Sequence, residues 1–210
     1  MDIQVYHADK DHLGYAQEVC QLIEHAAQQR GTGIAKRTPE YIIRKMEEGK
    51  AVIALCDGQL AGFCYIESWG HEQYVANSGL IVHPDYRRTG LAKRIKEKIF
   101  NLSRKKYPMA KIFGITTSLA VMKINSGLGY KPVTFSELTT DESFWKGCRS
   151  CPNYDILQRT SRHHCLCTGM LYEPSRGSQK AHKQDTVNGG RWERFKKFLK
   201  NAKKLKNEKE

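Results

Sequence analysis

A basic loop with one glycine, in the middle of the chain, has the residue types that bind phosphate. It reads Arg87-Arg88-Thr89-Gly90-Leu91-Ala92 and joins an apolar, strand-like run to a segment with helical periodicity. The first N–H groups of a helix have no internal partner and lie at the positive end of its dipole, so an anion there is bound by backbone amides. Gly90 would let a ligand approach closely, and the arginines add charge. Taken alone, the spacing fits a phosphate site or a solvated basic turn.

The spacing Arg87-x-x-Gly90-x-Ala92 resembles the acyl-CoA pyrophosphate signature, Gln/Arg-x-x-Gly-x-Gly/Ala, of the GNAT superfamily of N-acyltransferases. The resemblance covers about residues 1–138. It implies that acetyl-CoA or another acyl-CoA is the cofactor, with its pyrophosphate on the amides of residues 87–92. It also implies that pantetheine lies beside a strand that splays from its neighbour. In this chain that strand edge would consist of Leu80, Ile81 and Val82.

Amine acylation by a thioester requires a base for the ammonium, a donor for the oxyanion and an acid for the leaving thiolate. Glu67 follows an apolar run, and His71 and Glu72 follow in the next loop, so these three are alternative bases. Solvated side chains at a strand end are the competing interpretation. Many GNAT enzymes use a tyrosine as the acid, but Asn125 stands at the corresponding place. Asn125 is therefore expected to hydrogen-bond the cofactor or the thiolate, while solvent supplies the proton.

Two cations follow a glycine-containing segment between the first two expected helices. In this fold that loop covers the substrate pocket, and here it ends in Lys36 and Arg37. A guanidinium can bind a carboxylate with two hydrogen bonds, so the loop suits a small acidic substrate, although solvated cations are an alternative. Over about residues 1–174 the sequence is also similar to a bacterial group of GNAT proteins associated with arginine biosynthesis, which resemble glutamate N-acyltransferases. The resemblance implies transfer of acetyl or succinyl to L-glutamate.

The late cysteines form two pairs, Cys148-x-x-Cys151 and Cys165-x-Cys167. Four thiolates are enough for a tetrahedral structural zinc site, although the single residue inside the second pair differs from zinc ribbons. Packed or redox-capable thiols are the alternative. The chain has seven cysteines in all, and an odd number without a secretory signal favours reduced thiols over a disulfide framework.

Periodicity and turn signals predict an α/β fold. The expected order is two helices, two antiparallel strands joined at Asp57-Gly58, the cofactor strand and its helix, and then a strand, a helix and a strand. This is the element order of the GNAT fold, which has a mixed, mostly antiparallel sheet with flanking helices. The predicted helices cover residues 12–29, 39–48, from 91 onward and 118–128, and the predicted strands cover 51–56, 60–66, 75–82, 111–116 and a segment after 132.

The chain is expected to divide into four parts: a core over 1–138, a cysteine-containing extension with a final strand over 139–174, a linker over 175–190, and a basic amphipathic helix over 191–210. Residues 176–210 carry 12 Lys+Arg and 4 Asp+Glu, so they hold +8 of the formal charge of +13. Charge is therefore weak support for nucleic-acid binding by the core. We expect a cytoplasmic protein, because no apolar run has the length of a membrane span.

One rival interpretation is a protein- or ribosome-associated N-acetyltransferase, or a nucleic-acid-associated binding protein that uses the basic segment. Contact of this segment with an anionic membrane is compatible with its apolar face, and homo-oligomerisation is another expected arrangement. A small-molecule amino acid is the favoured partner, because the loop with Arg37 suits a carboxylate.

Overall fold

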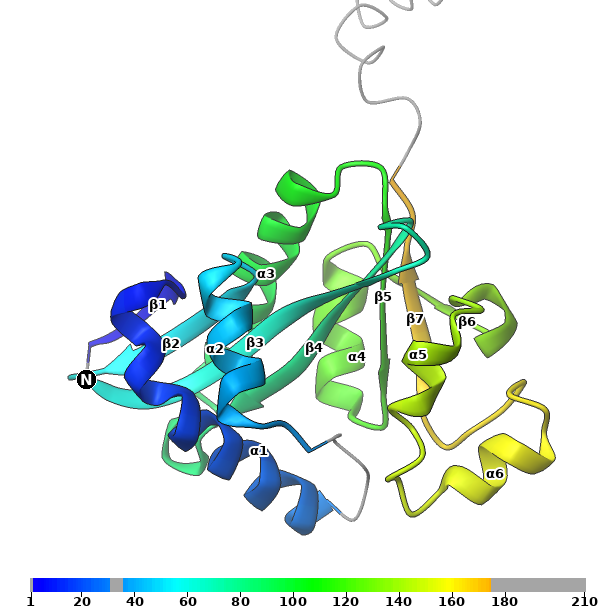
Figure 1. Cartoon of the computed structure of the whole chain (residues 1–210), viewed down its shortest axis with the longest axis horizontal. Coiled ribbons are helices and arrows are strands. Elements are labelled where there is room, and N and C mark those ends of the chain that lie inside the picture. The colour runs from blue at the N-terminus through cyan, green and yellow to red at the C-terminus, as the bar shows by residue number, and fades with distance from the viewer. Residues whose placement is uncertain (1, 31–35, 175–210) are drawn as a thin grey trace, which may run out of the picture. The chain divides into compact units, whose positions relative to one another are not determined.

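A mixed seven-stranded sheet forms the centre of the protein (Figure 1). The computed structural model describes residues 2–30 and 36–174, so the expected linker 175–190 and helix 191–210 lie outside the described residues. The sheet order is β1-β2-β3-β4-β5-β7-β6, and β4–β5 is its parallel pair. The strands are β1 (Ile3–His7), β2 (Ala51–Cys56), β3 (Gln59–Trp69), β4 (Tyr74–Val82), β5 (Lys111–Thr116), β6 (Lys131–Val133) and β7 (Thr168–Tyr172). The predicted α/β class with a mostly antiparallel sheet is confirmed.

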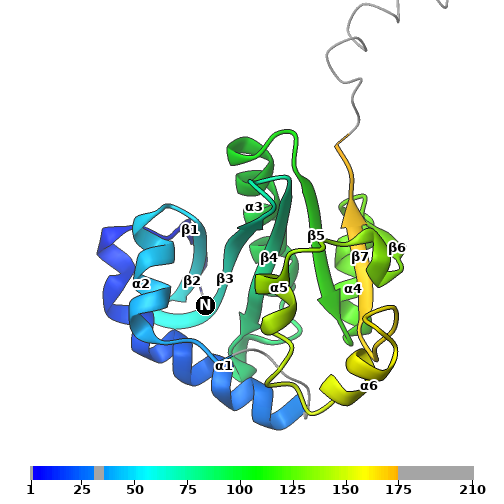
Figure 2. The same cartoon turned by 45° about the vertical axis from the view of Figure 1, so that its right-hand side comes forward.

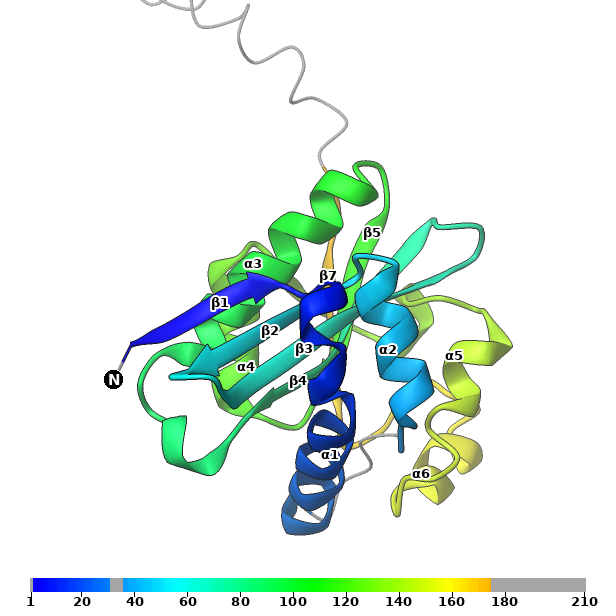
Figure 3. The ribbon, with the colours of Figure 1, turned by 60° about the vertical axis from the view of Figure 1, so that its left-hand side comes forward.

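Helices cover both faces of the sheet (Figures 2 and 3). One core cluster packs α1 and α2 against β2 and β3, and another packs α3 against the opposite face. None of the described helices is long and apolar enough to cross a membrane. The α-helices are α1 (Ala16–Arg30), α2 (Pro39–Glu47), α3 (Leu91–Lys106), α4 (Leu119–Gly127), α5 (Glu142–Lys146) and α6 (Tyr154–Arg159), and short 3-10 turns cover Lys10–Tyr15, Pro84–Tyr86 and Phe135–Glu137.

Local sequence signals account for most of the element ends. Thr38 caps α2 through its side chain, which accepts a hydrogen bond from the Tyr41 N–H, and Pro39 occupies the first helical position. Asp57 and Gly58 form the β2–β3 turn with φ values of 48° and 79°, as two-residue hairpins require. The first helix differs from the prediction, because residues 10–15 form a 3-10 turn and the α-helix begins at Ala16.

The extension after residue 138 is an integral part of this sheet. Its last strand, β7, inserts between β5 and β6 and pairs antiparallel with both. Trp145 and Leu157 from the same segment pack with Phe113 and Leu171 in a third core cluster. The predicted final strand is therefore present, and it completes the sheet from a position late in the sequence.

Strands β4 and β5 pair over a short distance and then separate (Figure 1). Their register joins Tyr74 to Lys111, Val75 to Ile112 and Ala76 to Phe113. On their other edges, β5 pairs with β7 from Ile112 to Thr116 and β4 pairs with β3. The sheet thus opens between the two strands from Asn77 onward.

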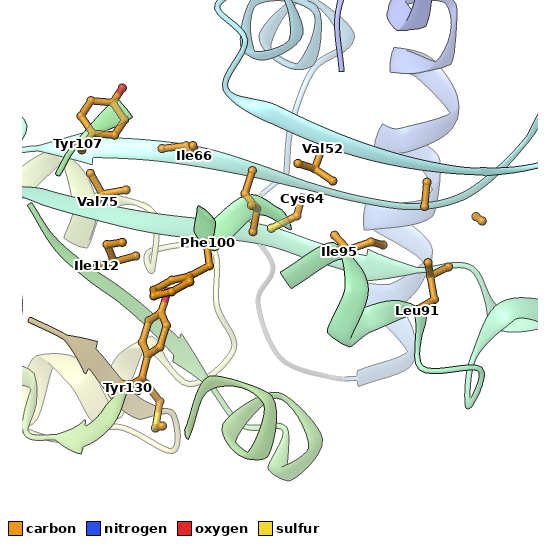
Figure 4. Close-up of a cluster of buried hydrophobic side chains, with 14 of the residues drawn as sticks. Val52, Cys64, Ile66, Val75, Leu91, Ile95, Phe100, Tyr107, Ile112 and Tyr130 are labelled. Carbon is orange, nitrogen blue, oxygen red and sulfur yellow. The ribbon is translucent and has the colours of Figure 1, made fainter. Parts of the chain in front are cut away.

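Side-chain alternation divides the opening between two environments. Val75 and Ile112 pack with the helix α3 cluster, which Figure 4 shows in close-up, whereas Ala76 and Phe113 pack with the cluster of the extension. Phe100 of α3 lies with its ring centroid 5.5 Å from that of Tyr130 in the first cluster. The gap between β4 and β5 is therefore bordered by the α3 cluster on one face of the sheet and by the cluster of the extension on the other.

Gly62 supplies a test of this packing, because strand β3 lies against α3 at that residue. A Cβ at Gly62 would lie 2.6 Å from Ile95 Cδ1 and 2.8 Å from the carbonyl oxygen of Ile81. Because backbone cannot yield as a flexible side chain can, we expect Gly62→Ala to cost about 1–3 kcal/mol of folding free energy. Chemical denaturation would measure this cost. Gly14→Ala, where nothing lies within 4 Å, is the control. Equal stability of the two variants would contradict the packing at β3.

Candidate active site

A cavity of about 800 Å³ lies at the point where β4 and β5 separate. Its wall includes residues from β3, β4 and β5, from α2 on one face of the sheet and from α3 and α4 on the other. The gap itself contributes Asn77, Ser78, Gly79 and Leu80 from β4 and Gly114, Ile115 and Thr116 from β5. A ligand placed in this cavity would therefore reach groups that belong to both faces.

The predicted phosphate loop has the geometry of a helix N-terminus. Gly90 is the N-cap of α3 with φ 81°, and a Cβ there would meet nothing within 4 Å. Thr89 donates its hydroxyl to the Tyr86 carbonyl at 2.8 Å, which fixes the turn, and Arg88 has φ 66°. Leu91 is buried, so the helix is anchored while the opening turn faces open space. The amides of this first turn can receive an anion.

The three residues of the predicted strand edge have different environments. Leu80 lines the cavity. Ile81 is buried and packs in the cluster of α1 and α2, while Val82 pairs with Gly62 and packs toward α3. The side chain of Leu80 is thus the one of the three that borders the opening, and a ligand would meet Ile81 through its backbone.

Glu67 lines the cavity on the α2 face and forms an ion pair that the sequence did not indicate. Its Oε2 accepts a hydrogen bond from Lys45 Nζ of α2 at 2.9 Å. Burial raises the pKa of Glu67 to about 7, and the charge of Arg37 opposes this shift. Burial also lowers the pKa of Lys45 to about 8. Their attraction favours both charged forms, whereas burial opposes them and brings both pKa values near neutral pH.

The two alternative bases lie at the tip of the β3–β4 hairpin. His71 and Glu72 both line the cavity, and both are exposed, with φ values of 51° and 67°. Neither has the buried ion pair that distinguishes Glu67. Among the three predicted bases, Glu67 is therefore the one whose environment suits proton transfer.

Arg37 and Lys36 are adjacent in sequence but lie in different surroundings. Arg37 lines the cavity, and its Nε donates to the Tyr65 hydroxyl at 2.7 Å while the guanidinium lies 5.0 Å from the centroid of the Tyr41 ring. Lys36 is exposed and pairs with Glu24 at 3.3 Å. The structure thus brings Arg37 to the cavity and leaves Lys36 on the surface.

Asn125 lies on the opposite face, in α4. It is 2% exposed and lines the cavity, and its Oδ1 has no hydrogen-bond partner among the described residues. Lys96 of α3 and Asn77 of β4 line the same wall, where Lys96 Nζ donates to Asn77 Oδ1 at 3.1 Å. A buried acceptor without a donor is costly, which suits a site that a ligand fills.

The four late cysteines receive no support as a zinc site. Within residues 2–30 and 36–174, no three His, Cys, Asp or Glu side chains form a group that could hold a metal ion. The thiols do lie near one another, and burial raises the pKa of Cys148 to about 11 and that of Cys167 to about 12. Cys165 and Cys167 lie just before β7, which begins at Thr168, so neither is part of a strand. Buried, protonated thiols fit the alternative of packed residues.

Several cavity residues were not predicted from the sequence. Lys45 and Lys96 resemble ordinary helix-surface lysines, but each lies on the buried side of its helix. For Lys96 a signal existed, because residues 92, 96, 99 and 103 recur at helical spacing and include small or apolar neighbours. Lys45 is flanked by charged residues and its burial depends on α2 packing, so no comparable signal existed for it.

Comparison with known proteins agrees with this geometry. Residues 32–119 match the acetyltransferase (GNAT) family, and no curated protein matches the chain significantly. Among similar solved structures, N-acetylglutamate synthase from Neisseria gonorrhoeae with coenzyme A and N-acetyl-glutamate has 15% identity and a TM-score of 0.57, and the match covers 84% of this chain and 36% of that one. A Salmonella typhimurium protein with its cofactor acetyl-CoA has 12% identity and a TM-score of 0.58, with coverage of 85% and 97%.

A ribosomal-protein-alanine N-acetyltransferase from Escherichia coli has 14% identity and a TM-score of 0.52, with coverage of 85% of this chain and 98% of that one. At these identities the structures share a fold, and their acceptors differ. The family match, the separated β4 and β5 strands and the helix N-terminus that follows β4 agree with one another. Residues 32–119 therefore match the acetyltransferase (GNAT) family, and the described part of the chain has the fold of these solved structures.

Proposed function

We propose that the protein transfers an acetyl group, or a succinyl group, from its CoA thioester to the amine of a small acidic amino acid, with L-glutamate as the best candidate and arginine biosynthesis as the setting. The observation that carries this proposal is Arg37, a cavity-lining guanidinium fixed by Tyr65 and near enough to Glu67 to influence its charge. One cation and one proton acceptor in the same wall can hold the carboxylate and the amine of one amino acid.

The acyl-CoA would occupy the opening between β4 and β5, with its pyrophosphate on the amides of residues 87–92 and its pantetheine beside Leu80. Support comes from the free edge of β4 after Ala76 and from the N-terminus of α3. The thioester supplies an activated acyl group. The backbone amides and the side chains of the protein bind and orient it.

Glu67 would take the proton of the acceptor ammonium. A carboxylate with a pKa near 7 is half ionised at neutral pH and is a stronger base than an ordinary glutamate, so it removes this proton more readily. Lys45 keeps the carboxylate oriented through its 2.9 Å contact and stabilises the ionised form. Arg37 would hold the substrate carboxylate, leaving the amine directed toward the thioester.

The N. gonorrhoeae synthase, whose structure contains N-acetyl-glutamate, supports a glutamate acceptor by its shared fold, although this chain covers only 36% of that protein. The E. coli enzyme acts on a ribosomal-protein alanine, and a protein amine is therefore the rival acceptor. A thiol-release assay with acetyl-CoA and succinyl-CoA against a panel of amino acids and N-terminal peptides tests the proposal. Preference for a peptide over every free amino acid would replace the substrate proposed here.

Arg37→Ala should raise the KM for glutamate. Loss of a charge-assisted, two-point contact costs about 1.5–3 kcal/mol, which corresponds to an increase of about 10- to 100-fold. The KM for acetyl-CoA should stay within about twofold, because Arg37 contacts the acceptor side. Steady-state kinetics measures both constants. Arg159→Ala is the control, since Arg159 is exposed and pairs with Asp155. Unchanged glutamate KM in Arg37→Ala would remove the proposed carboxylate contact.

Gly90→Val should abolish tight acetyl-CoA binding. Valine strongly disfavours a φ of 81°, and its branched side chain would fill the space in front of the first amides of α3. Isothermal titration calorimetry should show a loss of at least about tenfold in affinity, the value of one strong hydrogen bond. Gly49→Val carries comparable backbone strain at φ 59°, far along the chain, and should bind normally. Equal affinities in the two variants would exclude the loop as the pyrophosphate site.

Glu67→Gln should lower kcat by about 100-fold, within the range for loss of a general base. In the wild type, kcat should rise as pH increases through about 7, because Glu67 must lose its proton before it can act. The variant should lack this limb and show a lower, flatter profile. Stopped-flow or steady-state rates between acidic and alkaline pH provide the measurement. Glu72→Gln is the control. If Glu72→Gln, and not Glu67→Gln, lowers kcat and loses the acidic limb, Glu72 is the base.

A further inference from the structure

Lys96 is a lysine buried in the protein, on helix α3. It is 2% exposed, and among residues 2–30 and 36–174 no carboxylate pairs with it. Its Nζ donates to Asn77 Oδ1 at 3.1 Å and lies 5.0 Å from the centroid of the Tyr130 ring. Burial of an ammonium with so little compensation is costly, and a leucine or methionine would pack there without that cost. Stability alone therefore gives no reason for a lysine at this place.

The neighbours of Lys96 hold its amine in one position. Asn77 Nδ2 donates to Ser103 Oγ at 2.7 Å, and Tyr130 donates its hydroxyl to Asn77 Oδ1 at 3.1 Å. These two contacts fix which end of the Asn77 amide faces Lys96. An ammonium has three N–H donors, and Asn77 takes one of them. The remaining donors are available to a group in the cavity that Lys96 lines.

The groups that face Lys96 are neutral. Burial raises the pKa of Cys64 to about 12 and raises the pKa of Tyr130 well above its usual value, so neither carries charge near pH 7. Asn77 and Ser103 do not titrate. Burial lowers the pKa of Lys96 itself to about 8. The amine is therefore protonated in neutral solution and gives up its proton more readily than an exposed lysine.

The location connects this amine with the reaction. Asn77 is the first residue of β4 beyond the β4–β5 pairing, so Lys96 reaches the opening where the thioester would lie. Asn125, with its unpartnered buried Oδ1, borders the same cavity from α4. Glu67 borders it from the other face with α2. The acceptor base and the buried amine thus stand on opposite sides of the sheet opening.

We propose that Lys96 donates the proton that the CoA sulfur requires when the thioester is cleaved, and that Asn125 holds the pantetheine arm by accepting a hydrogen bond from one of its amide N–H groups with the free Oδ1. This inference rests on the acyl-transfer function proposed above. It assigns the acid to a residue of α3. The sequence alone had indicated Asn125 at the place of the usual tyrosine and solvent as the source of the proton.

The step balances in atoms and electrons. Glu67 takes one proton from the acceptor ammonium, and the resulting amine forms a C–N bond with the thioester carbonyl carbon. When the C–S bond breaks, its electron pair goes to sulfur, and a proton from Lys96 Nζ makes the thiol. The nitrogen loses its second proton to solvent as the amide forms. Glu67 then releases its proton to solvent and Lys96 regains one from solvent, so one proton is released per turnover.

Lys96→Met tests the proposal, because methionine keeps the length of the side chain and fits a buried site. We expect kcat to fall about 100-fold while the calorimetric affinity for acetyl-CoA stays within about twofold. The alkaline limb of the kcat profile near pH 8 should disappear with the titrating amine. Lys105→Met is the matched control on the exposed side of the same helix and should behave as the wild type.

A second measurement does not depend on turnover. An ammonium beside the sulfur lowers the pKa of bound CoA thiol, so the ultraviolet absorbance of the thiolate should appear at lower pH in wild type than in Lys96→Met. Lys96→Gln repeats this titration if the methionine variant folds poorly. The two proposals can fail separately. If the wild type acetylates no acceptor but its bound CoA thiol still ionises at lower pH than in Lys96→Met, the proposed function is refuted and the contact between Lys96 and the sulfur stands.

The opposite pattern overturns the assignment. An active wild type whose Lys96 variants keep their kcat and titrate bound CoA at the same pH would show that Lys96 does not contact the sulfur. Lower thermal stability in Lys96→Met, with an unchanged thiolate titration in its folded fraction, would likewise identify a purely structural lysine. Asn125→Ala should weaken CoA binding, because the free Oδ1 is lost. It should keep the alkaline limb of the kcat profile, because an asparagine side chain does not titrate.

Discussion

The separation of β4 from β5 after Ala76 is the constraint on which the site depends. A parallel pair that continued through Asn77 would close the sheet and satisfy the backbone groups of both strands. Instead, the two strands part after Ala76. β5 is paired with β7 and β4 with β3, so the edge of β4 that faces β5 is left open toward the cavity. Buried backbone groups need partners, and an extended ligand lying along the gap would supply them. The same opening lets side chains from both faces reach one space.

Maintaining this opening requires packing on each side. Helix α3 fills one face through Ile95, Ile99 and Phe100, while the extension fills the other through Trp145 and Leu157, which pack with Phe113 of β5. The close contact of Gly62 with Ile95 fixes α3 against β3, and the first turn of α3 then carries the anion-binding amides. The phosphate loop and the reactive cavity are thus positioned by one rigid helix, so binding at one end aligns groups at the other.

Three ionisable side chains lie around the cavity at places where burial makes their charged forms costly. Glu67 and Lys45 share a half-buried pair, and Lys96 is buried with uncharged partners. Burial shifts all three pKa values toward neutrality, so Glu67 becomes a stronger base and the two lysines become stronger acids than their exposed counterparts. Such groups reduce folding stability, and their position around one cavity is typical of a site organised for proton transfer. The four late thiols show the contrast, because burial raises the pKa values of Cys148 and Cys167 and favours the inert protonated form.

The sequence by itself determined the element order from α1 to β6, the Asp57-Gly58 hairpin, the Thr38 cap and the basic glycine loop, because each depends on short-range geometry or periodicity. It did not predict β1, α5 or α6. It also identified Glu67, Arg37 and Asn125 as residues of interest. The tertiary structure decided that Arg37 and not Lys36 lines the cavity, that Lys45 pairs with Glu67, and that Lys96 is buried. These outcomes depend on which helix face meets the sheet and on how β4 and β5 part. Contacts between residues far apart in the chain fix both. Local spacing can place Lys96 on the inner side of its helix, but it does not record which residues meet across the fold.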